Sequence, residues 1–299
     1  MVKEVGSMNY SEIKPEEMYE LICQANLPQQ QAYVTRDKSK LYFRHYPSDS
    51  NRILILLHGI SEDSKYLFRL AEYVSSNHLA QVYTPDLRGY GTYAERKGDV
   101  DYIGQLDDDL AGLIHLIKEK NNHAKIILGG HSIGGGTVLR FSGSQYSDLI
   151  DAFLFIAPYI HPNAPTNRKN EGGNSKVSLA KLILLYLFEA LRIRGFHHWN
   201  ILNVTKPMDI QHGGETLNLS FRLLMSRIPQ NYQQNIKKIT KPSFVVIGDK
   251  DELFYSEKFD SLFSPNQNIV TKVLPNHNHD GILFSSETYK EVEKWLAEL

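Results

Sequence analysis

Short aliphatic runs recur along most of this chain, and segments with helical periodicity lie between them. A run of consecutive aliphatic residues suits a strand buried on both faces of a parallel sheet, because a strand with one solvated face would alternate apolar and polar residues. The aliphatic runs are 53–57, 81–84, 125–128, 152–156, 243–247 and 269–274, and the helical patterns are 65–76, 104–120, 135–143, 255–263 and 286–299. Their alternation predicts βαβ units and therefore an α/β fold with a mostly parallel, doubly wound sheet.

The first fifty residues follow a different pattern, which predicts a helix and an edge hairpin. Residues 15–25 have a helical pattern, and segments 31–35 and 41–46 are typical of two paired strands with a turn at 37–39. With the six aliphatic runs, these two strands give a sheet of about eight strands.

One interval interrupts the alternation. Some eighty residues separate the run 152–156 from the run 243–247, too many for a simple crossover. We therefore expect a core made of residues 1–159 and 241–299, with a helical cap inserted at 160–240. Within the cap, the polar segment 163–175 predicts a loop and the apolar segment 177–193 predicts a helix with a broad apolar face. That face has to be buried against the body of the protein, a ligand or a membrane surface.

Composition and charge exclude several classes of protein. Among the 299 residues, 33 Lys and Arg balance 34 Asp and Glu, so the chain has no electrostatic footprint for nucleic acid. The single cysteine, Cys23, cannot form an internal disulfide. The N-terminus lacks the apolar run of a secretory signal, and no stretch reaches the roughly 18 apolar residues that span a bilayer. We expect a cytoplasmic protein that acts on a small molecule, and no pattern specifies an oligomeric state.

A strand, a tight turn and a helix are predicted around Ser132. In the sequence Lys125-Ile-Ile-Leu-Gly-Gly-His-Ser-Ile-Gly-Gly-Gly, the serine lies between Gly130 and Gly134 as G-x-S-x-G. Such a sharp turn strains the backbone of the serine, and a Cβ at either glycine would collide with neighbouring elements. The pattern is typical of a nucleophile elbow, whose serine attacks an acyl carbonyl.

A serine hydroxyl is a weak nucleophile until a base takes its proton, so the elbow predicts an acid and then a histidine later in the chain. Two acids, Asp249 and Asp251, follow the strand at 243–247, and two histidines, His277 and His279, follow the last strand. The residues alone leave both choices open.

Two further predictions concern the surroundings of this serine. His58 and Gly59 follow the strand 53–57. The loop there would let the backbone N–H of Ile60 form an oxyanion hole together with the backbone N–H of Ile133. Each donor would stabilise the transition state by about 3 kcal/mol. The histidine pair with Asp280 lacks the H-E-x-x-H arrangement of hydrolytic zinc sites, so we expect no metal and no cofactor.

Together these motifs resemble the lysophospholipase and monoglyceride-lipase-like branch of the α/β-hydrolases, of the serine aminopeptidase S33 type. The resemblance covers about residues 40–160 and 235–299. The matching stretches are His58-Gly-Ile-Ser-Glu-Asp-Ser, Pro85-Asp-Leu-Arg-Gly-Tyr-Gly, Gly130-His-Ser-Ile-Gly-Gly, Lys241-Pro, Gly248-Asp-Lys-Asp and Asn278-His-Asp-Gly-Ile. The resemblance implies a catalytic triad of Ser132, Asp251 and His279, which selects Asp251 over Asp249 and His279 over His277.

The resemblance also implies hydrolysis of a carboxylic ester, without a cofactor, beneath the cap. The apolar helix 177–193 favours a lipophilic ester, such as a lysophospholipid or a monoglyceride, and a transient contact with a membrane surface. The same scaffold also supports thioester or carbon–carbon bond hydrolysis, acyl transfer, or ligand binding without catalysis.

Overall fold

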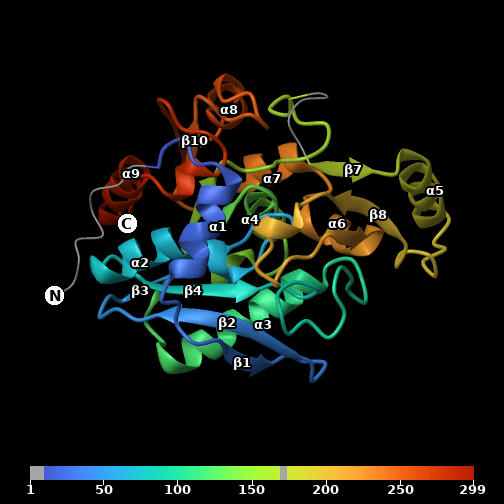
Figure 1. Ribbon diagram of the computed structural model, residues 1–299, viewed down its shortest axis with the longest axis horizontal. Helices are drawn as coiled ribbons and strands as arrows, with labels where there is room; N and C mark the ends of the chain where they lie inside the picture. The colour runs from blue at the N-terminus through green and yellow to red at the C-terminus, as the bar shows by residue number, and fades with distance from the viewer. Residues whose placement is uncertain (1–9, 169–173) are drawn as a thin grey trace.

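A mostly parallel sheet forms the centre of the molecule, as the sequence predicts (Figure 1). The computed structural model describes residues 10–168 and 174–299. The terminal segment 1–9 and part of the loop predicted at 163–175 lie outside the described residues. Within that part of the chain, eight strands pair in the order β1-β2-β4-β3-β5-β6-β10-β11. Strand β2 is antiparallel to both of its neighbours, and the remaining pairs are parallel.

The strands of this sheet are, in spatial order, β1 (Gln31–Val34), β2 (Lys40–Tyr46), β4 (Gln81–Asp86), β3 (Arg52–Leu57), β5 (Lys125–His131), β6 (Ala152–Ile156), β10 (Ser243–Gly248) and β11 (Ile269–Leu274). The helices outside the long interval are α1 (Pro15–Gln24), α2 (Phe68–Ser76), α3 (Gln105–Lys120), α4 (Ile133–Ser142), α8 (Glu257–Phe263) and α9 (Ser286–Ala297). Short 3₁₀ turns are η1 (Ser64–Leu67), η2 (Ser147–Leu149) and η4 (Gly281–Leu283).

Helices cover both faces of the sheet. Strands β6 and β10 are buried at every residue, and β3 and β5 at every residue after the first, which requires cover above and below the sheet. One group of helices pairs α2 with α9, and another pairs α4 with α6 (Phe221–Arg227) and α7 (Tyr232–Lys238). The central strands therefore form a buried core that holds the loops at their carboxyl ends in place.

The register of the parallel strands brings those carboxyl ends to one edge of the sheet. Leu57 of β3 lies opposite Gly130 of β5, and His131 of β5 lies opposite Ile156 of β6. On the far side of β6, Gly248 of β10 lies opposite Leu274 of β11. The chain segments that follow β3, β5, β10 and β11 consequently meet at the edge where sites form in sheets of this kind.

The long interval between β6 and β10, residues 157–242, is called the insertion below. Its elements are β7 (Ser175–Val177), α5 (Leu179–Ala190), β8 (Asn200–Val204), η3 (Met208–Ile210), β9 (Asn218–Ser220), α6 and α7. The predicted helix at 177–193 is present as α5. The prediction of a helical cap is wrong in one respect, because β7, β8 and β9 form a three-stranded antiparallel sheet. These strands have three to five residues, and the wholly exposed β7 shows no alternation that could identify it.

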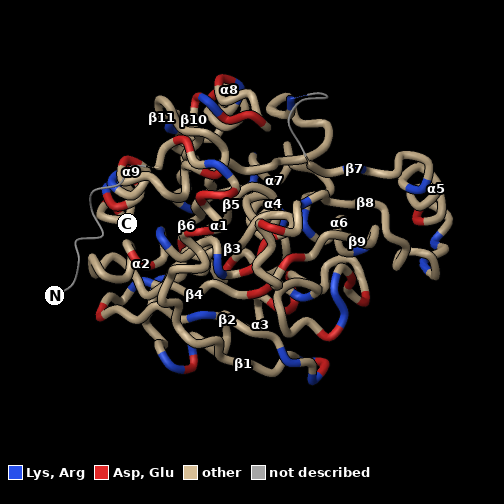
Figure 2. The backbone as a smooth tube through the Cα atoms, viewed as in Figure 1, with Lys and Arg blue, Asp and Glu red and all other residues tan. Residues whose placement is uncertain are grey.

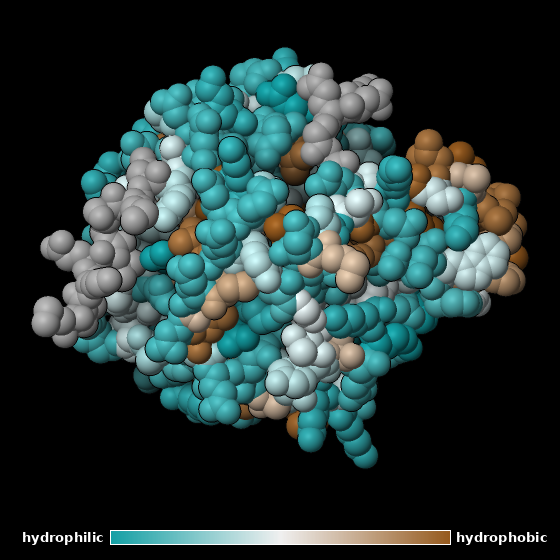
Figure 3. Space-filling view, in the orientation of Figure 1, coloured by the Kyte–Doolittle hydropathy of each residue, from teal (hydrophilic) through white to brown (hydrophobic). Residues whose placement is uncertain are grey.

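Helix α5 projects from the body, at the right of Figure 1, with much of its apolar surface uncovered. Leu185 is its one buried residue, whereas Leu179 is 68% exposed, Ile183 70% and Leu187 54%. Figure 3 shows this lobe as the largest brown area on the visible face. Packing onto the core, one of the three ways to bury this face, is therefore excluded for these side chains. Across the described ranges, helices that combine the length and apolar character needed to cross a bilayer are absent.

Candidate active site

Ser132 lies at the turn between β5 and α4, where the sequence predicts an elbow. Its φ of 54° and ψ of −125° are strained for a residue with a side chain. A Cβ on Gly130 would collide with the backbone of Gly134, and a Cβ on Gly134 would collide with the carbonyl oxygen of Leu57. The two glycines thus allow helix α4 to start directly against β3 and β5, which leaves the serine at the tip of the turn.

Asp251 and His279 form a buried, hydrogen-bonded pair next to this turn. Nδ1 of His279 lies 2.8 Å from Oδ2 of Asp251. The other carboxylate oxygen, Oδ1, accepts the backbone N–H groups of Leu253 and Phe254, both at 2.9 Å. Because both oxygens are engaged, the carboxylate cannot rotate, and it holds the imidazole with Nδ1 as the protonated nitrogen. Nε2 is then the nitrogen that can accept a proton.

The charge of Asp251 also changes the acidity of His279. Burial lowers the pKa of the imidazole, but the adjacent carboxylate raises it by more, and the net result is a pKa of about 9. The pair therefore stabilises the imidazolium that forms when a base takes a proton.

Ser132 and His279 line the same pocket, which has a volume of about 240 Å³. Oγ of Ser132 has no hydrogen-bond partner among the described residues. An open nucleophile–base pair is common before substrate binds, because the hydrogen bond tightens in the complex. The geometry suits removal of the serine proton during attack on a carbonyl.

The β3 loop, residues 58–63, forms another wall of the pocket, and Ile60 is part of that wall. Ile133 is the first residue of α4, so its N–H has no partner within the helix. Within the described part of the chain, no acceptor takes the N–H of Ile60 or that of Ile133. Both N–H groups are thus free to donate to a bound oxyanion.

His58 shapes the β3 loop and cannot act as a base. Nδ1 lies 2.9 Å from the carbonyl oxygen of Gly59, and Nε2 accepts the N–H of Leu87 at 3.2 Å. Burial, and then the cation of Arg227, lowers the pKa of His58 to about 3. The ring is therefore neutral, with both nitrogens engaged.

The two rival residues from the sequence lie elsewhere. Asp249 is exposed and accepts the N–H of Asn276 at 2.6 Å. His277 is buried, with its ring nitrogens bonded to Pro275 and Ser285. Neither residue lines the pocket. The structure thus places His279 in the pocket of Ser132 with Asp251 hydrogen-bonded to it, whereas Asp249 and His277 take part in neither contact.

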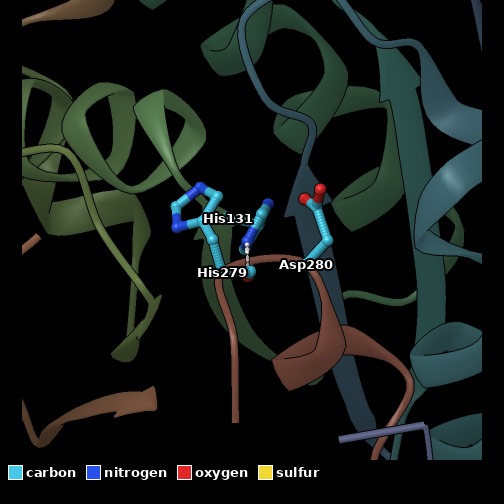
Figure 4. Close-up of side chains that lie close together, drawn as sticks. All are labelled: His131, His279 and Asp280. Carbon is cyan, nitrogen blue, oxygen red and sulfur yellow. Dashed lines mark hydrogen bonds between the residues drawn. The ribbon is translucent and has the colours of Figure 1, made fainter. Parts of the chain in front are cut away.

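His131, His279 and Asp280 come close together beside the pocket (Figure 4). One nitrogen of each histidine and one carboxylate oxygen lie within 4.8 Å of one another, a spacing that a metal ion could bridge. However, Nδ1 of His131 is bonded to the hydroxyl of Tyr66 at 2.7 Å, and Nε2 to the carbonyl oxygen of His279 at 2.9 Å. His131 has no lone pair left for a metal, so the trio does not form a ligand set.

These hydrogen bonds connect the β3 loop to the loop that carries His279. The N–H of Gly59 donates to the Tyr66 hydroxyl at 2.7 Å, and that hydroxyl bonds His131. Burial, and then the neighbouring His279, holds the pKa of His131 well below its usual range, so His131 stays neutral. Sequence reasoning missed both Tyr66 and His131, since an aromatic residue in a helical pattern and the variable residue of G-x-S-x-G carry no distinct signal.

Arg227 is a second residue that sequence reasoning missed. Its side chain is fully buried and lies over the ring of Tyr90. Nη2 donates to the carbonyl oxygen of His58 at 2.6 Å, and Nε donates to Oγ1 of Thr137 at 2.8 Å. It therefore ties helix α6 of the insertion to α4 and the β3 loop. An arginine in an apolar sequence segment gives no indication of such a contact.

A cluster of charged residues joins the insertion to the β3 loop at the pocket. Nζ of Lys206 lies 2.9 Å from Glu62 and 3.2 Å from Glu215, and Nε2 of His212 lies 3.2 Å from Glu62. Burial raises the pKa of Glu62, but His212 and Lys206 together lower it to about 2. Glu62 is therefore ionised and fully occupied by partners from the insertion.

Comparison with known protein families and curated proteins gives a consistent result. A family model described as serine aminopeptidase, S33, matches residues 48–283. The chain is similar to a monoglyceride lipase of Saccharomyces cerevisiae, 26% identical over 168 residues, which cover 51% of this chain and 52% of that relative. It is also similar to a monoacylglycerol lipase of Mycolicibacterium smegmatis, 22% identical over 212 residues, covering 69% of this chain and 72% of the relative. The chain thus spans about half the length of the yeast relative.

Solved structures at lower identity share the fold. The monoacylglycerol lipase of Paleococcus ferrophilus has a TM-score of 0.66 at 19% identity, covering 87% of this chain and 99% of its own. A soluble variant of the yeast monoglyceride lipase, in complex with a substrate analog, has a TM-score of 0.65 at 20% identity, covering 92% and 96%. The eight-stranded sheet with its helices is therefore the predicted fold.

Proposed function

The chain belongs to the serine aminopeptidase S33 family of α/β-hydrolases, and from that premise we propose that it is a serine hydrolase of carboxylic esters. The observation that carries the proposal is that His279 lines the same pocket as the strained Ser132 and is hydrogen-bonded to the buried Asp251. We assign Ser132 as nucleophile, His279 as base and Asp251 as the residue that orients the base.

The reaction follows from these positions. His279 takes the proton of Ser132 through Nε2 while Oγ attacks the ester carbonyl carbon, and the N–H groups of Ile60 and Ile133 stabilise the oxyanion. The tetrahedral intermediate collapses, the alcohol leaves with the proton from His279, and the acyl group stays on Ser132. Water then attacks the acyl-enzyme by the same route, which releases the carboxylic acid and restores the serine.

Labelling and mutation test this assignment. A fluorophosphonate should label Ser132, and Ser132→Ala should lose both labelling and hydrolysis of an aryl ester. The matched control is Ser142→Ala at the far end of helix α4, where the Ser142 hydroxyl donates to the Leu139 carbonyl oxygen outside the pocket. Near-wild-type turnover by Ser132→Ala would disprove the nucleophile.

We propose further that the ester is lipophilic and is drawn from a lipid surface by way of helix α5. Leu179, Ile183 and Leu187 expose a continuous apolar face because they follow one another at helical spacing. The segment 176–199 contains four Lys or Arg residues and a single acid, Glu189. Figure 2 shows this basic excess on the α5 lobe. An apolar face with a basic surround suits a bilayer that contains anionic lipids, and the insertion then acts as a cap that passes substrate to the pocket.

Vesicle binding tests the lipid contact separately from catalysis. The double variant Ile183→Ser, Leu187→Ser should lose binding to phosphatidylserine-containing vesicles but keep hydrolysis of a short, water-soluble aryl ester. Val34→Ser, which removes a 66% exposed apolar side chain from the edge strand β1, is the control and should bind as the wild type does. Wild-type protein that does not bind such vesicles, or a preference for the shortest acyl chains, would contradict a lipid substrate.

A further inference from the structure

Asp280 is a carboxyl group in the candidate active site that the proposed reaction does not use. It lines the pocket together with Ser132 and follows His279 directly in sequence. In Figure 4 its carboxylate and the imidazole of His279 rise from adjacent positions of one loop, on either side of the His131 ring. Asp280 precedes the turn η4, yet its side chain does not cap that turn.

No hydrogen bond or ion pair engages the Asp280 carboxylate among residues 10–168 and 174–299. The other two acids that line the pocket have partners: Glu62 bonds Lys206 and His212, and Glu252 accepts the backbone N–H of His279 at 3.0 Å. Burial raises the pKa of Asp280, His279 lowers it in part, and the neighbouring carboxylates raise it further, to about 6. A partly buried carboxylate without a partner is unfavourable, and this one faces the space that substrate would occupy.

The charges on the pocket wall restrict what can approach Asp280. Three carboxyl groups line the pocket in the described residues, and its two cationic groups are already paired, Lys206 with Glu62 and Glu215, and the protonated His279 with Asp251. A phosphate or carboxylate on the substrate would meet uncompensated negative charge of the same sign. An alkyl chain against Asp280 would bury the carboxylate without a hydrogen bond, so the end of the ester that faces it has to be polar.

On the basis of the proposed ester hydrolysis, we propose that Asp280 is a specificity-determining residue that accepts a hydrogen bond from a hydroxyl on the alcohol portion of the ester. The pocket then selects esters of polyols, whose alcohol portion is neutral and donates hydrogen bonds. It rejects esters whose alcohol portion carries a phosphate close to the ester bond. The acyl chain lies away from Asp280, toward the apolar residues of the insertion, Val204 and Ile210, which line the same pocket.

Four octanoate esters separate the contributions to this selectivity. Glyceryl octanoate has free hydroxyls, ethyl octanoate is neutral without a donor, choline octanoate is cationic without a donor, and octanoyl glycerol 3-phosphate is anionic. We expect kcat/KM of the wild type to be highest for the glyceryl ester and lowest for the phosphate ester. Asp280→Asn should reduce the ratio of kcat/KM for the glyceryl ester to that for the ethyl ester about tenfold, because a hydrogen bond to a charged acceptor becomes one to a neutral acceptor. It should also improve hydrolysis of the phosphate ester.

Comparing two esters in one variant removes effects common to both, such as a change in the pKa of His279. Asp209→Asn, which removes the same charge from an exposed position next in sequence to the pocket residue Ile210, is the control and should leave the ratio unchanged. An unchanged ratio of kcat/KM for the glyceryl ester to that for the ethyl ester in Asp280→Asn would overturn the inference. A wild-type preference for the choline ester that Asp280→Asn abolishes would also overturn it, because that result indicates that Asp280 attracts a cation. In either case, continued labelling of Ser132 by fluorophosphonate and hydrolysis of the ethyl ester would leave the proposed function standing.

Discussion

Asp251→Asn tests the candidate triad most directly, because the structure fixes which way the new side chain has to point. Oδ1 of Asp251 accepts two backbone N–H groups, from Leu253 and Phe254, so the amide oxygen of the asparagine must take that position. The amide NH₂ then faces Nδ1 of His279. Nδ1 becomes the acceptor, and the ring proton moves to Nε2, the nitrogen that should receive the proton of Ser132. A base held in the wrong tautomer lowers kcat by about 10⁴-fold.

The same substitution should change the pH dependence of the residual activity. In the wild type, burial lowers the pKa of His279 and the Asp251 carboxylate raises it to about 9. Without the carboxylate, the largest contribution that raises the pKa is lost, so the pKa falls and the rise of kcat/KM with pH occurs at a lower pH. A mutation that merely disturbed the fold would lower activity at every pH without this displacement.

The assay is hydrolysis of a short aryl ester from pH 5 to 10, with Asp249→Asn as the matched control. Asp249 lies two residues away, outside the pocket, where its carboxylate accepts the N–H of Asn276. Asp249→Asn should stay within a fewfold of the wild type, whereas Asp251→Asn should lose nearly all turnover. Activity of Asp251→Asn within about tenfold of the wild type would refute the reasoning.

Three further predictions use other features of the site and fold. His279→Gln should abolish turnover, whereas His277→Gln should keep it. His277→Gln should lose about 1 kcal/mol of stability in urea unfolding, because it disturbs the buried hydrogen bonds of His277. Loss of turnover in His277→Gln and not in His279→Gln would move the base by two residues. Wild-type kcat/KM should increase with pH up to about 9, because only neutral His279 can act as a base. The stability that the His279–Asp251 pair contributes is complete below about pH 6.5 and is lost as the pH rises through 9. A plateau of kcat/KM that begins near pH 6.5 would contradict the raised pKa. Gly134→Ala should be strongly destabilised by its clash with the Leu57 carbonyl, whereas Gly112→Ala, with open space around it in helix α3, should gain up to about 1 kcal/mol in thermal unfolding.

Local sequence was sufficient for the elements and for the elbow. Consecutive aliphatic residues predict doubly buried strands, and the observed β3, β5, β6 and β10 are buried in that way. Gly130 and Gly134 predict a close approach of backbones around Ser132, and the structure has it. These features depend on neighbours in sequence, so periodicity and glycine placement reveal them. The short strands β7, β8 and β9 were missed because three to five residues carry too little pattern.

Tertiary structure decided what lies around the serine. The sequence alone presented two acids and two histidines, and only the parallel pairing of β10 with β11 shows that Asp251 reaches His279 while Asp249 does not. The hydrogen bonds from Gly59 through Tyr66 to His131 join residues as many as 72 positions apart, and no local pattern can predict such contacts. The sequence by itself therefore determined the sheet, the elbow and an apolar helix at 177–193. Only the packed chain decided that this helix is exposed and that Asp280 faces the pocket with no partner among the described residues, because both features depend on distant segments.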